Sequence, residues 1–200
     1  MKAVLFDLGR VLVHYDHAKT LRAVAALTTS DLAALQSLMQ EISVPLGKGE
    51  IDAEGLHALF GARLGLTADF ATFINAFAAG IERDEAALAY AVALQNRPET
   101  TVAVISNTND AHVRWLDDHV PELMAFDLVM MSNEVGVLKP APVIYELALE
   151  LLSVLPVQAI FIDDLAVNVE AATALGLAGI VHQDWAETRP QLEQWLAQPA

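Results

Sequence analysis

The sequence predicts an α/β fold in which a doubly wound parallel sheet carries an inserted small helical unit. Short apolar runs rich in β-branched residues recur along residues 84–200, and helical patterns of about 10 residues separate them. This alternation predicts βαβ units and therefore a parallel sheet. Residues 16–82 show helical periodicity instead and follow directly after the first strand, which predicts the insertion.

The first strand is a continuous apolar run from Ala3 to Leu8 that ends at a glycine. Such a run is typical of a strand that is buried on both faces of a parallel sheet. The sequence Val-Leu-Val at residues 11–13 predicts a second short extended segment. The helical pattern begins near Asp16.

Capping residues and helix breakers divide residues 16–82 into several helices. We expect caps at Ser30 and Asp52, a break at residues 45–47, an end at Gly65, and a last helix from Thr67 to Gly80. Four of the seven Phe residues lie between positions 60 and 77 at helical spacing. An aromatic stripe of this kind favours a small apolar core of the helical unit itself.

The remaining chain alternates between strands and helices. The expected strands are residues 101–105, 126–131, 159–162 and 178–181, and the expected helices are residues 84–96, a segment ending near His119, residues 142–152 and residues 167–175. We therefore expect residues 1–15 and 83–200 to form a Rossmann-like core and residues 16–82 to form the helical unit.

The composition limits the classes of function. With 11 basic and 26 acidic residues the net charge is −15, which repels phosphate backbones and anionic lipid surfaces, so we expect neither nucleic acid nor a membrane as partner. The absence of cysteine excludes thiol catalysis and thiolate metal sites. No apolar stretch reaches about 18 residues, and Met1 leads directly into a strand, so we expect a cytoplasmic protein.

Polar side chains follow three of the expected strands. Such sheets bind ligands at the carboxyl ends of their strands, so these groups are expected to meet at one edge. They are Asp7 after the first strand, Ser106 and Asn107 after the second, and Asp163 with Asp164 after a later one, and Lys139 precedes a helix.

Phosphoryl transfer is the chemistry that needs this set. A carboxylate attacks a phosphate poorly because both are negative, so a cation and hydrogen-bond donors must neutralise and hold the phosphate. Asp7, Asp164 and a backbone carbonyl form the hard oxygen site that Mg²⁺ prefers. Lys139 supplies a positive charge, and Ser106 and Asn107 supply donors for a small phosphorylated metabolite.

At these positions the chain resembles the haloacid dehalogenase-like (HAD) hydrolase superfamily. The segment Phe6-Asp7-Leu8-Gly9 resembles its first motif, residues 104–108 its second, Lys139-Pro140 its third, and residues 161–164 its acidic fourth. The resemblance implies that Asp7 is the nucleophile that becomes an aspartyl phosphate. It also implies that residues 16–82 are the small helical cap of the family.

The resemblance further assigns the metal site. It implies that Mg²⁺ is bound by Asp7, by the backbone carbonyl of Gly9 and by Asp164, with Asp163 and Asn168 in supporting positions. Asn168 falls four residues after Asp164, where many members carry another acidic residue, and this spacing aligns Asp164 rather than Asp163 with the principal metal ligand.

A closer resemblance is to a small-cap branch of sugar-phosphate phosphatases of the glucose-1-phosphate type, and to the phosphatase domain fused to some epoxide hydrolases. Residues 138–145, residues 163–172 and the segment Gly49-Glu50-Ile51 carry it. The resemblance implies a Mg²⁺-dependent phosphatase that hydrolyses a small phosphomonoester, such as a sugar phosphate. We expect a monomer or a homodimer.

One position departs from the family pattern. Phosphatases of the superfamily usually carry a second Asp two residues after the nucleophile as general acid and base, and this chain has Gly9 there. Some members of the branch also carry glycine. General acid–base assistance is typically worth about 10²–10⁴ in rate, and a good leaving group needs less of it. His14 and Asp16 are alternative proton donors. The simpler interpretation is that both residues lie on the surface and have no part in catalysis.

Two other functions remain open at this point. One is a catalytically impaired protein that binds phosphate or metal, because Gly9 replaces the acid. The other is a metal-free 2-haloacid dehalogenase, against which the paired Asp163 and Asp164 argue because they repel a carboxylate substrate. Polar cap residues are further candidates for substrate contact, although an exposed position is the simpler interpretation: Asp16, His17, Glu50 and His57.

Overall fold

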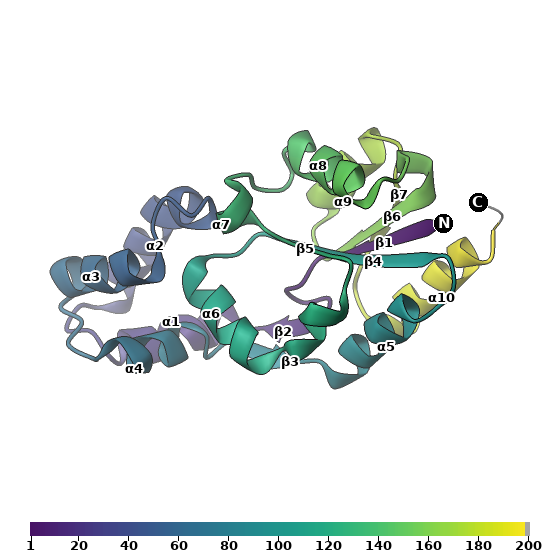
Figure 1. The fold of residues 1–200 in the computed structure, drawn as a ribbon. Helices are drawn as coiled ribbons and strands as arrows, with labels where there is room; N and C mark the ends of the chain where they lie inside the picture. Colours follow the sequence, from purple (N-terminus) through teal and green to yellow (C-terminus); the bar gives the residue numbers. More distant parts are fainter. Residues whose placement is uncertain (199–200) are drawn as a thin grey trace.

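A five-stranded parallel sheet forms the centre of the molecule (Figure 1). The computed structural model describes residues 1–198 of the 200-residue chain. The strand order is β5-β4-β1-β6-β7, and each neighbouring pair is parallel. The strands are β1 (Lys2–Phe6), β4 (Thr100–Ser106), β5 (Leu128–Met131), β6 (Ala159–Asp163) and β7 (Ala178–Val181).

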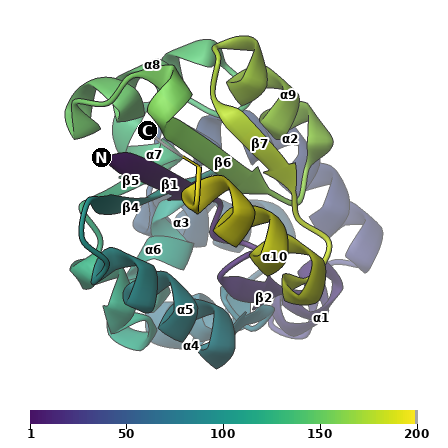
Figure 2. The same ribbon diagram turned by 90° about the vertical axis from the view of Figure 1, so that its right-hand side faces the viewer.

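Helices cover both faces of the sheet, which confirms the doubly wound α/β fold (Figure 2). One face packs against α5 (Glu85–Gln95), α6 (Asp110–His119) and α10 (Trp185–Leu196), and the other against α8 (Pro142–Leu152) and α9 (Ala166–Ala174). Each face has its own apolar cluster because side chains of successive strand residues point to opposite faces. Phe6 belongs to the first cluster and Leu5 to the second, and both are fully buried.

Four helices lie beyond the carboxyl ends of the strands (Figure 1). They are α1 (His17–Ala25), α2 (Leu32–Gly47), α3 (Ala53–Leu64) and α4 (Phe70–Phe77). Their shared apolar cluster includes Phe60, Phe73 and Phe77, whose rings pack 5.5–6.2 Å apart. Ala111 of α6 also packs in this cluster, so the division at residues 16 and 82 stays a prediction.

A short antiparallel pair connects the helical unit to the sheet. The chain leaves the first strand through β2 (Val13–Tyr15) and returns through β3 (Ile81–Arg83). The predicted extended segment at residues 11–13 lies two residues too early, because the backbone N–H groups of Val11 and Leu12 turn back to the carbonyl of Leu8.

Acidic residues begin most of the long helices. Each N-cap side chain accepts a hydrogen bond from a backbone N–H group of the first turn, which satisfies a donor that the helix itself leaves free. The acidic caps are Asp16, Asp31, Asp52, Asp69, Asp84 and Asp184, and the neutral side chain of Asn109 caps α6 in the same way. Part of the negative charge of the chain is therefore structural rather than functional.

Some local predictions differ from the structure. The cap of α2 is Asp31 rather than Ser30, and Pro45 lies inside the last turn of that helix rather than ending it. The sequence pattern also missed the short elements α7 (Ser132–Val135), η1 (Pro121–Ala125) and η2 (Pro156–Gln158), which are too short to show a period. Among residues 1–198, no helix is both long and apolar enough to cross a membrane.

Candidate active site

The predicted site residues meet at the carboxyl edge of the sheet. A cavity of about 550 Å³ opens there, between the strand ends and helix α2. Seven of the eight predicted site residues line it, namely Asp7, Gly9, Ser106, Asn107, Lys139, Asp164 and Asn168. The eighth, Asp163, is fully buried and contacts two of the seven, Lys139 and Asn168.

Lys139 lies between two carboxylates. Its Nζ donates to Asp7 Oδ1 and to Asp163 Oδ2, both at 2.7 Å. The ammonium also lies 5.2 Å from the centre of the Phe161 ring, and the residue is only 4% exposed. A buried ammonium needs such partners, because an unpaired charge in this environment is expensive. The contacts hold the positive charge of Lys139 beside Asp7.

The Asp7 carboxyl is held in an environment that disfavours its charged form. Burial raises the pKa of Asp7 to about 6, the Lys139 ammonium opposes this rise, and the Asp163 carboxylate adds to it. A carboxyl group with this pKa is mostly ionised at neutral pH, and further positive charge at this position would stabilise the Asp7 carboxylate as a nucleophile.

The two adjacent aspartates of the fourth motif differ in their contacts. Asp163 accepts hydrogen bonds from the Asn168 side chain at 3.0 Å and from the Leu165 backbone at 2.8 Å, in addition to Lys139. Its oxygens are thus already engaged. The Asp164 side chain is 18% exposed and lines the cavity. The assignment of Asp164 as the metal ligand and Asp163 as a supporting residue stays a prediction.

The three carboxylates provide a donor set that suits a hard divalent cation. One oxygen from each of Asp7, Asp163 and Asp164 lies within 4.8 Å of the others. Lys139 is the buried cation that faces Asp7 and Asp163, which leaves an excess of negative charge at this position. Carboxylate and carbonyl oxygens without nitrogen or sulfur ligands are typical of Mg²⁺ sites. These residues therefore fit the predicted cofactor.

The Asn107 side chain is bonded to the backbone of Lys139. Its Nδ2 donates to the Lys139 carbonyl at 2.9 Å, and its Oδ1 accepts from the Lys139 N–H at 2.8 Å. Asn107 therefore positions Lys139, a role that the sequence did not indicate. Its predicted role as a phosphate donor stays a prediction, as does that of Ser106, which is 4% exposed and lines the cavity.

Arg10 is a residue that the sequence analysis missed. Its backbone φ is 61°, a conformation that is uncommon for residues other than glycine. The side chain is 57% exposed, and Nη1 lies 3.4 Å from Asp164 Oδ2 at the entrance of the cavity. An arginine directly after the glycine was the available signal, but nothing in the sequence placed it beside Asp164.

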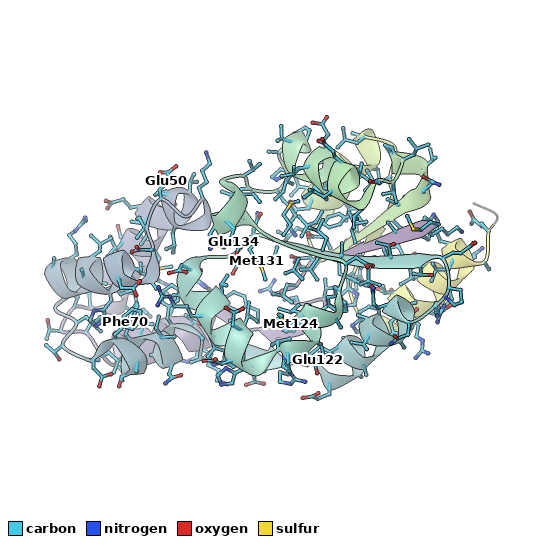
Figure 3. The ribbon with its side chains drawn as sticks, in the orientation of Figure 1. Glu50, Phe70, Glu122, Met124, Met131 and Glu134 are labelled. Carbon is cyan, nitrogen blue, oxygen red and sulfur yellow. The ribbon has the colours of Figure 1, made fainter. Side chains whose placement is uncertain are left out.

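The polar cap residues suggested from the sequence lie away from the cavity lining. Asp16 caps α1 and is exposed, and His17 is exposed beside the Tyr15 hydroxyl. His57 bonds to the Ala68 carbonyl within the helical unit. Glu50 is exposed just after α2 (Figure 3). The polar groups that do line the cavity from this side are Tyr15, Ser43, Asn109 and His112.

A model of the haloacid dehalogenase-like hydrolase family matches residues 1–176. The chain belongs to this family. The match includes every predicted site residue, and it confirms the resemblance that the four motifs indicated. The chain is therefore a hydrolase of the HAD type.

Curated relatives of this HAD hydrolase include two kinds of protein. D-ribitol-5-phosphate phosphatase of Bacteroides thetaiotaomicron is 25% identical over 206 residues, which cover 96% of the chain and 97% of that protein. Bifunctional epoxide hydrolase 2 of Rattus norvegicus is 32% identical over 114 residues, which cover 52% of the chain and 19% of the rat protein. The chain thus matches about a fifth of the length of the epoxide hydrolase.

Solved structures share the fold of this HAD hydrolase. A HAD family enzyme of Bacteroides thetaiotaomicron superimposes with a TM-score of 0.84 at 22% identity, covering 94% of the chain and 98% of the enzyme. L-2-haloacid dehalogenase of Xanthobacter autotrophicus reaches a TM-score of 0.60 at 22% identity, covering 97% and 83%. These likenesses confirm the α/β fold.

Proposed function

We propose that this HAD hydrolase is a Mg²⁺-dependent phosphatase that hydrolyses a small phosphomonoester through an aspartyl phosphate on Asp7. The observation that carries the proposal is the contact of Lys139 with Asp7 at the edge of the cavity, beside the additional carboxylate of Asp164. A carboxylate nucleophile, a buried ammonium and an oxygen-ligand cation site are the parts that phosphoryl transfer to Asp needs.

Each residue has a defined part in the reaction. An Asp7 oxygen attacks phosphorus, the bond from phosphorus to the leaving oxygen breaks, and the leaving oxygen takes up a proton from solvent water. Water then attacks the phosphorus of the aspartyl phosphate and loses a proton to solvent, which releases inorganic phosphate and restores the Asp7 carboxylate. Lys139 stays beside Asp7 and balances negative charge, and Ser106 and Asn107 hold phosphate oxygens.

The cation would be held by Asp7, Asp164 and the backbone carbonyl of Gly9. When bound, Mg²⁺ supplies the positive charge that lets an anionic nucleophile approach an anionic phosphate. The comparisons support this choice of cofactor, since a HAD family enzyme of Bacteroides thetaiotaomicron with the same fold has been solved in complex with magnesium and inorganic phosphate. The D-ribitol-5-phosphate phosphatase that matches nearly the whole chain supports the phosphatase reaction.

Phosphate release from a panel of phosphate esters, with Mg²⁺ or with EDTA, tests the proposal. We expect release only with Mg²⁺ and only with Asp7 present, so Asp7→Asn is the blank. Halide release from a 2-halo acid in EDTA would instead favour the dehalogenase. Binding of phosphate or Mg²⁺ without any turnover would identify the impaired protein that Gly9 leaves open.

A further inference from the structure

The cavity above Asp7 has two chemically different sides. The phosphate side, at the strand ends, carries the charged and amide groups described above. The opposite side is formed largely by apolar side chains from several elements, which we call the apolar wall. It consists of Val13 of β2, Met39 and Val44 of α2, Ile81 of β3, Leu116 of α6, and Leu138.

Two residues of the apolar wall, both on α2, are accessible to a ligand, whereas Val13, Ile81 and Leu116 are buried. Val44 is 53% exposed, and Met39 is only partly buried. Large apolar side chains that face a concave site gain from contact with an apolar ligand, because the contact removes both surfaces from water. The wall therefore favours a substrate whose non-phosphate part is itself apolar.

The polar groups on this side of the cavity already have hydrogen-bond partners within the protein. His112 Nε2 lies 3.2 Å from the Phe77 carbonyl and Nδ1 lies 3.2 Å from Asn109 Nδ2, while Asn109 Oδ1 accepts from the His112 N–H at 3.1 Å. Ser43 Oγ donates to the Gln40 carbonyl at 3.0 Å. Substrate hydroxyls placed here would lose water and find few free partners, which costs binding free energy.

The last turn of α2, close to Val44 of the wall, is attached to the core. Ser132 Oγ of α7 donates to the Gly47 carbonyl at the end of α2 at 2.7 Å. An added Cβ at Gly47 would lie 2.9 Å from Leu138 Cδ2, and one at Gly49 would lie 2.0 Å from the Asn133 carbonyl oxygen. The two glycines thus allow α2 and the chain after it to lie directly against the core.

We propose that the substrate is a phosphate monoester of an apolar alcohol or phenol, and that Met39 and Val44 select it over a polyhydroxylated sugar phosphate. This inference rests on the proposed phosphatase function and names its substrate class. The phenol esters of this class also fit the glycine at position 9. A phenol has a pKa of about 10, so a phenolate leaves with little help from a general acid.

The sharpest test compares pentyl phosphate with ribitol 5-phosphate. Both are esters of a primary alcohol with five carbons, and they differ only in the free hydroxyl groups. We expect kcat/KM for pentyl phosphate to be at least about tenfold higher. Along propyl, butyl and pentyl phosphate we expect a rise of about fourfold per CH₂. An equal or higher value for ribitol 5-phosphate would overturn the inference and leave the phosphatase function standing.

Variants of Met39 and Val44 test whether these two residues determine the preference for the apolar ester. Met39→Gln and Val44→Thr keep size and add polarity, so each should lower the pentyl-to-ribitol ratio of kcat/KM by about threefold or more. Val143→Thr is the matched control, because Val143 is 54% exposed on α8 and does not line the cavity. An unchanged ratio in both wall variants would refute their role. Absence of phosphate release from every ester would refute the phosphatase function itself.

Discussion

The Asn107 side chain forms hydrogen bonds with both polar groups of the Lys139 backbone. Its Nδ2 donates to the Lys139 carbonyl, and its Oδ1 accepts from the Lys139 N–H. The two residues are 32 positions apart, and they join the carboxyl end of β4 to the loop before α8. Lys139 Nζ in turn reaches Asp7 and Asp163. The placement of the ammonium therefore depends on an amide that belongs to another strand.

Replacing Asn107 by Ala tests this dependence. The substitution removes two hydrogen bonds, each worth about 1 kcal/mol, so we expect the free energy of unfolding to fall by about 2 kcal/mol. We also expect kcat to fall, because Lys139 is no longer held beside Asp7. Urea unfolding and steady-state phosphate release measure the two effects. Asn96→Ala is the control, since that amide bonds only within its own helix end; equal effects of the two substitutions would contradict the positioning role.

Gly9 offers a direct test of the missing proton donor. A Cβ built at Gly9 meets nothing within 4 Å, and the residue does not have a left-handed φ. We expect Gly9→Asp to leave the free energy of unfolding within about 0.5 kcal/mol and to keep kcat or to raise it by up to about 10².

The variant Gly9→Asn distinguishes an effect of proton donation on kcat from an effect of the larger side chain. The amide has the size of the carboxyl group but no proton to give at neutral pH. A gain in kcat with Gly9→Asp and none with Gly9→Asn would assign the gain to proton transfer. Complete loss of activity in both variants would show that the glycine is required for steric reasons.

Much of the fold was predictable because hydrophobic periodicity along the sequence distinguishes helices from strands, and because parallel strands end at the same edge of a sheet. The helix at residues 142–152 and the strand at residues 178–181 have the predicted bounds, since Pro142 marks a first turn and Gly176 a turn before a short apolar run. Asp7 and Asp164 meet because parallel strands end at one edge of the sheet.

The unpredicted part of the site depends on long-range packing. Arg10 reaches Asp164 across 154 positions, and His112 reaches Phe77 across 35. Neither residue stands out in the sequence, because an arginine in a turn and a histidine in a helix are ordinary. Asn107 was expected to bind phosphate, and its bonds to Lys139 could not be foreseen without the loop in place.

The partly buried imidazole of His112 should make stability depend on pH. Burial lowers the pKa of His112 to about 4, from 6.5 in an unfolded chain, and the Phe77 carbonyl opposes this only in part. Between pH 4 and 6.5 the unfolded state therefore binds the additional proton, so the free energy of unfolding rises with pH. The contribution is fully present above pH 6.5 and declines as the pH falls toward 4.

Comparison with His112→Gln isolates this contribution. The wild type should lose up to about 1.4 kcal/mol more stability than the variant for each pH unit between 6.5 and 4. Urea unfolding at pH 4.5, 5.5, 6.5 and 7.5 gives the two slopes. Parallel slopes would mean that His112 is protonated equally in the folded and unfolded chains.

The contact between Ser132 and Gly47 links substrate binding to the attachment of α2. Ser132 is fully buried, and its hydroxyl donates to the Gly47 carbonyl and accepts from the Thr108 N–H at 3.0 Å. Ser132→Ala removes both bonds, so we expect the free energy of unfolding to fall by about 2 kcal/mol. Because α2 carries Met39 and Val44, we expect KM for pentyl phosphate to rise roughly 5-fold, the equivalent of about 1 kcal/mol, with little change in kcat.

Ser37→Ala is the control for this prediction. Ser37 is at an exposed position of the same helix, so the substitution should change neither the free energy of unfolding nor KM. A fall in kcat with KM unchanged would place the role of Ser132 in the chemistry at Asp7 rather than in holding the apolar wall.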